Sequence, residues 1–186
     1  MTNKKQRRRK VRRVIKKPKT DSQVKKILKK INILILGSGY PPNELKKRVA
    51  IRNKLRKLGY SANVMEETPQ PKRQTTHVDK FHDLLDMKNL LCVAISTPKG
   101  YTNGLSFEIG YIAGVFGRTK KGRERLQREL GFIISKKADK RKILSSYITT
   151  GLFYDGIVNY EYDNIKEIIK YIEIMVKNRA INLGLL

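Results

Sequence analysis

The sequence predicts an α/β fold in which a five-stranded parallel sheet is covered by helices on both faces. Short apolar runs bounded by turn residues alternate along the chain with amphipathic helical segments, the pattern of strand–helix–strand units. The run Leu90–Ile95 is apolar throughout, as expected for a buried central strand. At 186 residues the chain is long enough for one core, which we place at residues 31–186, after a basic arm at residues 1–30.

The first strand is predicted at Ile31–Leu36, an apolar run that ends at the tight turn Gly37-Ser38-Gly39. We expect Asn43 to cap the next helix, because its side chain can accept a hydrogen bond from a free N–H of the first turn. Gly59 is expected to end this helix. The residues expected on its buried stripe are Val49, Leu55 and Leu58.

The remaining elements keep the same alternation. In chain order we expect a strand at 61–65, a polar loop at 66–74, a helix at 75–87, the strand at 90–95, a helix from about 103 to 116, strands at 130–135 and 157–160, and a closing helix at 164–176. The segment 118–129, of mixed charge, should form either a solvated helix or an added basic contact. The residues of the helix at 75–87 that should point inward are Val78, Phe81, Leu84 and Leu85. This order predicts a flavodoxin-like fold.

The segment Asn103–Gly114 begins an amphipathic helix with one acidic residue, Glu108, on its apolar side. A buried carboxylate is unfavourable unless it is paired, protonated or open to a cleft. An alternative interpretation is that Glu108 is simply an acid that the helix dipole favours near the helix N-terminus. The dipole does not explain why Glu108 lies on the apolar side of the helix. Glu108 is therefore a candidate site residue. The apolar stripe that contains it consists of Leu105, Ile109, Ile112, Val115 and Phe116.

Ligands of such sheets bind outside the carboxyl ends of the strands, where the strand order reverses. The loops 37–42 and 96–103 should meet there, beside the helix of Glu108. Their N–H and hydroxyl groups could contact a phosphate or a ribose, although a plain tight turn explains the glycines equally well. The candidate binding residues at this edge are Gly37, Ser38, Gly39, Ser96, Thr97 and Asn103.

A single acid at this edge suits the cleavage of one kind of N-glycosidic bond. Breaking such a bond passes through an oxocarbenium-like ribose, which a nearby carboxylate can stabilise or trap. Glycosidases normally need a second carboxyl group to protonate the leaving oxygen. Nicotinamide leaves NAD with the pyridinium charge as its driving force, so one acid can suffice. Glu108 is the candidate for that acid.

From about Ile33 to Ile172 the chain resembles the TIR-like domain of predicted nucleotide-binding proteins in prokaryotic anti-phage systems. The resemblance implies a flavodoxin-like fold and NAD glycohydrolase activity in defence signalling, with Glu108 at the catalytic glutamate, NAD as substrate and no metal. It also adds Tyr147 to the residues that would bind the nucleotide. The segments that carry it are Glu44–Gly59, Glu66-Glu67-Thr68-Pro69, Asp79-Lys80-Phe81-His82, Val93–Pro98, Phe107–Gly114 with Gly117-Arg118, and Leu144-Ser145-Ser146-Tyr147.

The chain also departs from that family. Gly39-Tyr40-Pro41-Pro42 stands where the family usually has an acidic or basic residue, and Ser146 replaces the acid of its Ser-Asp-Tyr loop. The nucleoside deoxyribosyltransferases carry their glutamate in a similar context and are a second alternative. Their accompanying aspartate corresponds to Thr102, which argues against that chemistry. Regulation by another subunit, assembly into a homo-oligomer and loss of catalysis all remain open.

Positive charge is concentrated at the start of the chain. The formal net charge is +26, and residues 1–30 contribute fifteen lysines and arginines against one acid, so polyanions are natural partners. The alternative function is a non-catalytic protein that binds RNA or the ribosome through this arm, although no RNA-recognition motif is present. A solubilising tail without a partner is the plainest interpretation. The candidate nucleic-acid contacts are Arg7, Arg8, Arg9, Lys10, Arg12 and Arg13.

The composition also bears on other classes of protein. No apolar run approaches the roughly 20 residues of a membrane helix, and the N-terminus lacks a signal-peptide core, so we expect a cytoplasmic protein without membrane contact. Cys92 is the one cysteine, which excludes an internal disulfide. His77 and His82 are poorly spaced for a metal pair, and we assign no metal site. Val24, Ile27 and Leu28 predict a short helix that docks on the body.

Overall fold

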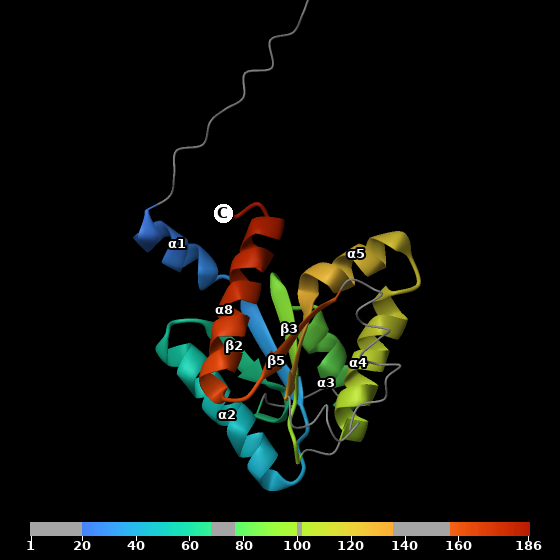
Figure 1. The fold of residues 1–186 in the computed structure, drawn as a ribbon. Helices are drawn as coiled ribbons and strands as arrows, with labels where there is room; N and C mark the ends of the chain where they lie inside the picture. Colours follow the sequence, from blue (N-terminus) through green and yellow to red (C-terminus); the bar gives the residue numbers. More distant parts are fainter. Residues whose placement is uncertain (1–19, 68–76, 100–101, 136–156) are drawn as a thin grey trace, which may run out of the picture.

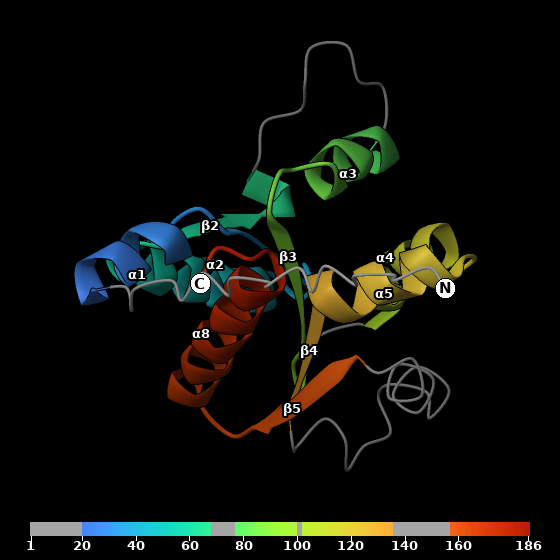
Figure 2. The same cartoon turned by 90° about the horizontal axis from the view of Figure 1, so that it is seen from above.

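Five parallel strands form one sheet in the order β2-β1-β3-β4-β5, with helices on both faces (Figures 1 and 2). The computed structural model describes residues 20–67, 77–99, 102–135 and 157–186. The strands are β1 (Asn32–Gly37), β2 (Ser61–Val64), β3 (Leu90–Ser96), β4 (Leu130–Ser135) and β5 (Val158–Tyr162). The strand order and the two helical layers confirm the predicted flavodoxin-like fold, with β3 at the centre of the sheet.

The helices divide into two layers that bury separate apolar clusters. One layer packs β1, β3 and β4 residues such as Ile33 and Val93 against α1, α2 and α8, and the other packs residues such as Leu34 and Phe132 against α3, α4 and α5. Because neighbouring residues of a strand point to opposite faces, a strand buried on both sides must be apolar throughout. The helices are α1 (Asp21–Leu28), α2 (Pro42–Lys57), α3 (His77–Leu85), α4 (Thr102–Phe116), α5 (Lys120–Glu129) and α8 (Ile165–Asn182), with the 3₁₀ turn η1 (Met65–Glu67).

The short helix that the apolar residues near the end of the arm predict is present as α1. Thr20 caps it, since its hydroxyl accepts a hydrogen bond from the Gln23 N–H while the Gln23 side chain accepts one from the Thr20 N–H. Leu28 is buried, and Val24 and Ile27 pack against the same cluster. The helix therefore docks on the body beside α8, as Figure 1 shows.

Helix α2 ends where predicted, with Leu58 as its C-cap and Gly59 in the left-handed conformation directly after it, but it begins differently. It begins at Pro42 with Pro41 in the N-cap position, so Asn43 is not the cap. Proline is favoured in the first turn because the N–H groups there have no partner within the helix, so the N–H that proline lacks is not missed. Leu58, predicted on the buried stripe, is 54% exposed because it lies beyond the last turn. The buried face of α2 consists of Glu44, Arg48, Ile51 and Leu55.

Two further residues were wrongly assigned to the core. Val78, in the first turn of α3, is exposed because it lines a cavity rather than the core, whereas Phe81, Leu84 and Leu85 are buried as predicted. Val115 is exposed because the buried stripe of α4 is narrower than the sequence suggested and is formed by Leu105, Ile109 and Ile112. The mixed-charge segment 118–129 forms α5, which is solvated except at the buried Leu126.

The closing helix α8 continues past its predicted end because its buried face includes a charged residue. Arg179 is buried, and its guanidinium donates hydrogen bonds to the Leu90 carbonyl at 2.9 Å and to Glu129 at 2.7 Å. Those partners satisfy the charge inside the fold, and the helix runs on to Asn182. Within the described residues, none of the helices combines the length and apolar character needed to cross a membrane.

Candidate active site at the carboxyl ends of the strands

The neighbouring strands β1 and β3 send the chain to opposite faces of the sheet. Gly37 at the end of β1 pairs with Ile95 near the end of β3. From β1 the chain enters α2, which packs with α8, whereas from β3 it enters α4, which packs with α5. In sheets of this order the divergence creates the ligand crevice. The structure thus brings the loop of Ser38 and the loop of Thr97 to one edge.

Glu108 lies on the core-facing side of α4, with 7% of its surface exposed. The Gly37 N–H donates a hydrogen bond to its carboxyl group. Its Oε2 atom is buried and has no hydrogen-bond partner among the described residues. Within that part of the chain, no lysine or arginine forms an ion pair with it. The acid is thus buried without a neutralising contact.

Burial raises the pKa of Glu108 from its ordinary value of 4.5 to about 8. The positive charge of Arg48 lowers this pKa, the negative charge of Glu66 raises it, and the hydrogen bond from Gly37 lowers it, in that order of size. At neutral pH the carboxyl group of the ligand-free protein is therefore mainly protonated. A bound cation would favour its ionised form, because an opposite charge nearby stabilises a carboxylate.

Arg48 and Glu66, whose charges act on this acid, form an ion pair with each other. Arg48 is 1% exposed, and its Nη1 atom donates to Glu66 Oε2 at 3.0 Å while Nη2 contacts Oε1. The pair joins α2 to η1 through a bidentate contact, the geometry that an arginine fork favours. Because the guanidinium is committed to Glu66, it acts on Glu108 through its charge.

The glycines at the end of β1 allow the backbone to lie against this ion pair. A Cβ atom at Gly37 would be 2.9 Å from Arg48 Cδ and 2.9 Å from the Ile95 carbonyl oxygen. A Cβ atom at Gly39 would be 3.2 Å from Glu66 Oε1. The Ser38 hydroxyl bonds within its own turn, donating to the Tyr40 carbonyl. Close packing therefore accounts for both glycines.

Glu108 opens onto a small apolar cavity between α3 and α4. The cavity has a volume of about 170 Å³, and Glu108 is its acidic group. Ligand pockets for larger molecules begin at roughly 300 Å³, so this one suits a single ring or sugar. Its other lining residues are Met65, Val78, Phe81, Gly104 and Phe107.

The end of β3 adds two buried hydroxyl groups without partners among the described residues. Ser96 and Thr97 are both buried, and neither Oγ nor Oγ1 has a hydrogen bond in that part of the chain. The Ser96 carbonyl accepts a hydrogen bond from the Tyr162 hydroxyl at 3.0 Å. Buried polar atoms are nearly always paired, so a cluster of unpaired ones marks a place where a ligand or water would bind.

Most of the unpaired buried polar atoms of the described chain gather at this edge. Two of them belong to Ser96 and Thr97 at the end of β3, and three belong to α2 and α4, the helices that follow β1 and β3. The sixth, Asn159 Oδ1, lies on β5. This concentration distinguishes the edge from the rest of the described structure. The five are Glu44 Oε2, Arg48 Nε, Ser96 Oγ, Thr97 Oγ1 and Glu108 Oε2.

Some of the candidate residues cannot be placed at this site. Asn103 lies in the first turn of α4, where the backbone alone is described. Tyr147 lies outside the described residues. So do the candidate nucleic-acid contacts Arg7, Arg8, Arg9, Lys10, Arg12 and Arg13.

The sequence analysis missed the charged residues on the buried face of α2. Glu44 and Arg48 are separated by four positions and share a face with Ile51 and Leu55. The argument that singled out Glu108, a charge on an apolar stripe, applies equally to this pair. Glu66, the partner of Arg48, carries no such signal because it lies in η1 rather than in a periodic helix.

An aromatic contact joins α4 to α3. The Tyr111 hydroxyl contacts a ring nitrogen of His82, and the two rings meet edge to face with centroids 5.0 Å apart. His82 thus has a tyrosine ring as its neighbour. In the described ranges, no three His, Cys, Asp or Glu side chains group closely enough to hold a metal ion.

Comparisons of the chain with protein-family models, with curated proteins and with solved structures found no match.

Proposed function

We propose that this chain is an NAD glycohydrolase-like enzyme of TIR-like type, in which Glu108 drives cleavage of the bond between nicotinamide and ribose. One observation carries the proposal: a buried carboxyl group, without a cationic partner among the described residues, opens onto a small apolar cavity. The cavity lies at the edge of the sheet where ligands of this fold class bind.

The size and walls of the cavity favour a flat ring as the group bound next to Glu108. Phe81 and Phe107 supply aromatic surface, and Met65 adds a polarizable side chain. A pyridinium ring carries a positive charge, which aromatic faces and a carboxylate both attract. The positively charged nicotinamide ring of NAD can therefore bind favourably against both the aromatic walls and the carboxylate of Glu108.

The raised pKa of Glu108 fits a substrate that brings its own positive charge. In the ligand-free site the acid is mainly protonated at neutral pH, and the entering pyridinium favours loss of that proton. The carboxylate then stabilises the ribose cation while the C–N bonding electrons leave with neutral nicotinamide. Water adds to the ribose carbon and gives up a proton, so the products are ADP-ribose, nicotinamide and one proton.

The proposal is tested by incubating the full chain with NAD over a range of protein concentrations and measuring free nicotinamide by chromatography. Since the free protein must lose the Glu108 proton, kcat/KM should rise up to about tenfold per pH unit below the pKa of about 8 and level off above it. The Glu108→Ala variant should release none. An exposed acid on α5 provides the control, because Glu124→Gln should keep full activity.

Either of two results would contradict the proposal. One is nicotinamide release by Glu108→Ala at the wild-type rate. The other is a wild-type chain that stays inert at all concentrations, including those at which it assembles into oligomers.

We also propose that the basic arm binds nucleic acid, on the strength of the net charge of +26 and its concentration in residues 1–30. Changing the six cations from Arg7 to Arg13 to glutamine should reduce the salt dependence of binding to single-stranded RNA. The slope of log K against log salt should fall in magnitude by up to about 4, at roughly 0.7 per phosphate contact. Fluorescence anisotropy with a labelled oligouridine measures it. An unchanged slope would contradict the proposal, because it would mean that residues outside the arm make the phosphate contacts.

A further inference from the structure

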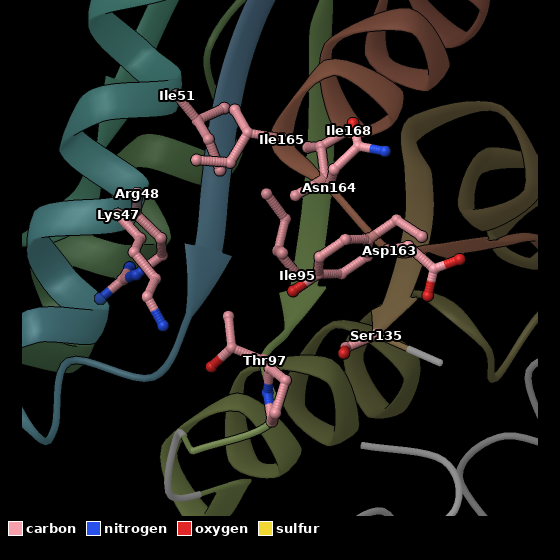
Figure 3. A pocket seen from close by; sticks show the side chains of 12 residues that line it. Lys47, Arg48, Ile51, Ile95, Thr97, Ser135, Asp163, Asn164, Ile165 and Ile168 are labelled. Atoms are coloured by element: carbon pink, nitrogen blue, oxygen red, sulfur yellow. The ribbon is translucent and has the colours of Figure 1, made fainter. Parts of the chain in front are cut away.

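A second cavity lies on the other face of the sheet edge, between α2 and α8 (Figure 3). Its volume is about 230 Å³, and the ends of β3, β4 and β5 form its floor. Glu108 does not line it, because α4 covers the opposite face. Neither the cleavage chemistry nor the basic arm uses this cavity.

Hydrogen-bond donors dominate the polar part of its wall. Arg48 and Lys47 reach it from α2, Thr97 from the end of β3, and Ser135 from the end of β4. Figure 3 shows the Lys47 amine and the Thr97 hydroxyl on facing sides of this end of the cavity. Arg48 Nε and Thr97 Oγ1 are buried and have no partner among the described residues. A ligand with hydrogen-bond acceptors could therefore pair with these two buried donors.

The charges around the cavity set how strongly an anion would bind. Lys47 contacts Glu44 at 2.7 Å and Arg48 contacts Glu66, so each cation already has one carboxylate partner. Lys47 has two further N–H groups to offer, because an ammonium carries three. Asp163 also lines the cavity, and in Figure 3 its carboxylate points away from Lys47 and Arg48. The donor end thus attracts an anion only moderately.

The rest of the wall is largely apolar. Ile51, Ile95, Ile165 and Ile168 supply branched aliphatic surface, and Tyr162 also lines the cavity. A simple inorganic anion would leave this surface in water, whereas a ligand with an apolar body would cover it. Burying that body supplies the affinity that the partly neutralised cations lack.

We propose that this cavity binds a compact organic anion, with one phosphate or carboxylate group at Lys47, Arg48 and Thr97 and an apolar, ring-sized body against the isoleucines. The site is separate from the Glu108 cavity and does not depend on the proposed cleavage of NAD. Arg48 is common to both, since it lines this cavity and its charge acts on Glu108. A ligand here is therefore placed to modulate the acid across the sheet edge.

The site is tested by titrating the full chain with four small probes: benzoate, benzamide, phenyl phosphate and inorganic phosphate. Binding is measured by calorimetry at 0.15 M salt, where exposed charges are screened. Benzoate and phenyl phosphate should both bind, and the tighter of the two identifies the preferred anion. Benzoate should bind at least about tenfold more tightly than neutral benzamide, and phenyl phosphate at least about tenfold more tightly than inorganic phosphate.

Neighbouring lysines on α2 provide matched variants. Lys47→Met and Thr97→Val should each weaken binding of the anionic probes, the first by about tenfold. Lys46→Met removes the same charge at an exposed position that does not line the cavity, and it should bind as the wild type does. Equal effects of the two lysine variants would contradict the inference, because they would show that the anions are attracted by the overall positive charge and not by this cavity.

Three other outcomes overturn the inference: no binding of either anion, equal binding of benzoate and benzamide, or equal binding of phenyl phosphate and inorganic phosphate. Because calorimetry needs no turnover, the site stands if the chain proves inert toward NAD. The cleavage proposal likewise stands if the probes fail to bind.

Discussion

Replacing Glu108 with glutamine is expected to abolish nicotinamide release and, at alkaline pH, to stabilise the folded protein. The amide has nearly the shape of the protonated acid but cannot ionise, so it removes the carboxylate that the cleavage requires. It also removes the free energy that the fold loses when this buried group becomes charged. Loss of activity together with a gain in stability is the expected signature of a buried functional acid.

The direction of the stability effect follows from the pKa. A carboxyl group whose pKa rises on folding holds its proton more tightly in the folded state, so the free energy of unfolding falls as the pH increases between the two values. For Glu108 this window extends from 4.5 to about 8, and the loss is then complete. At roughly 1.4 kcal/mol per pH unit over this window, the difference between variant and wild type grows to on the order of 5 kcal/mol.

Urea denaturation of both proteins at pH 5 and pH 8.5 measures this difference. The Glu108→Gln variant should be close to the wild type at pH 5 and more stable at pH 8.5. Other titrating groups are the same in both proteins and cancel. Glu124→Gln on the exposed side of α5 should show no pH-dependent difference. If the difference in free energy of unfolding between variant and wild type were the same at both pH values, folding would not raise the pKa of Glu108.

Removing Arg48 is expected to have the second large effect, because its charge lies inside the fold with a carboxylate partner. Arg48→Met leaves Glu66, which is partly exposed, without its bidentate partner, and losing that partner should cost about 1–3 kcal/mol. The same change removes the positive charge that lowers the pKa of Glu108. The rise of kcat/KM with pH should therefore move to higher pH, while the free energy of unfolding falls.

A lysine at the same position separates the two roles of Arg48. Arg48→Lys keeps a positive charge but cannot reproduce the two parallel hydrogen bonds of the guanidinium. It should retain a pH profile closer to the wild type while losing part of the stability. Urea denaturation and pH–rate profiles of the three proteins measure both quantities. Identical pH profiles for Arg48→Met and the wild type would show that Arg48 has no influence on Glu108.

The strands and the burial of Glu108 could be predicted because local sequence carries both signals. Leu90–Ile95 is apolar at every position, which a strand covered on both faces requires. Glu108 interrupts an otherwise apolar stripe, and the helical period alone places it toward the core. In such cases the neighbours that matter are only a few residues away along the chain.

The partners of the site could not be predicted, because they come from distant segments. Arg48 and Glu66 are joined across eighteen positions, and Gly37 contacts Glu108 across the whole of β2 and β3. Packing, rather than local preference, decided those contacts. The N-cap of α2 was wrong for a local reason, since Pro41 and Pro42 fix the start of the helix ahead of Asn43.

The position of α1 has a consequence for the basic arm. Residues 1–19 precede a helix that leads into the amino end of β1, whereas Glu108 and Gly37 meet at the carboxyl end of the same strand. A strand of six residues places roughly 20 Å between these ends. That separation exceeds the Debye length of about 8 Å at physiological ionic strength. A polyanion held at the amino edge itself would therefore be screened from Glu108 and would leave the titration of that acid unchanged.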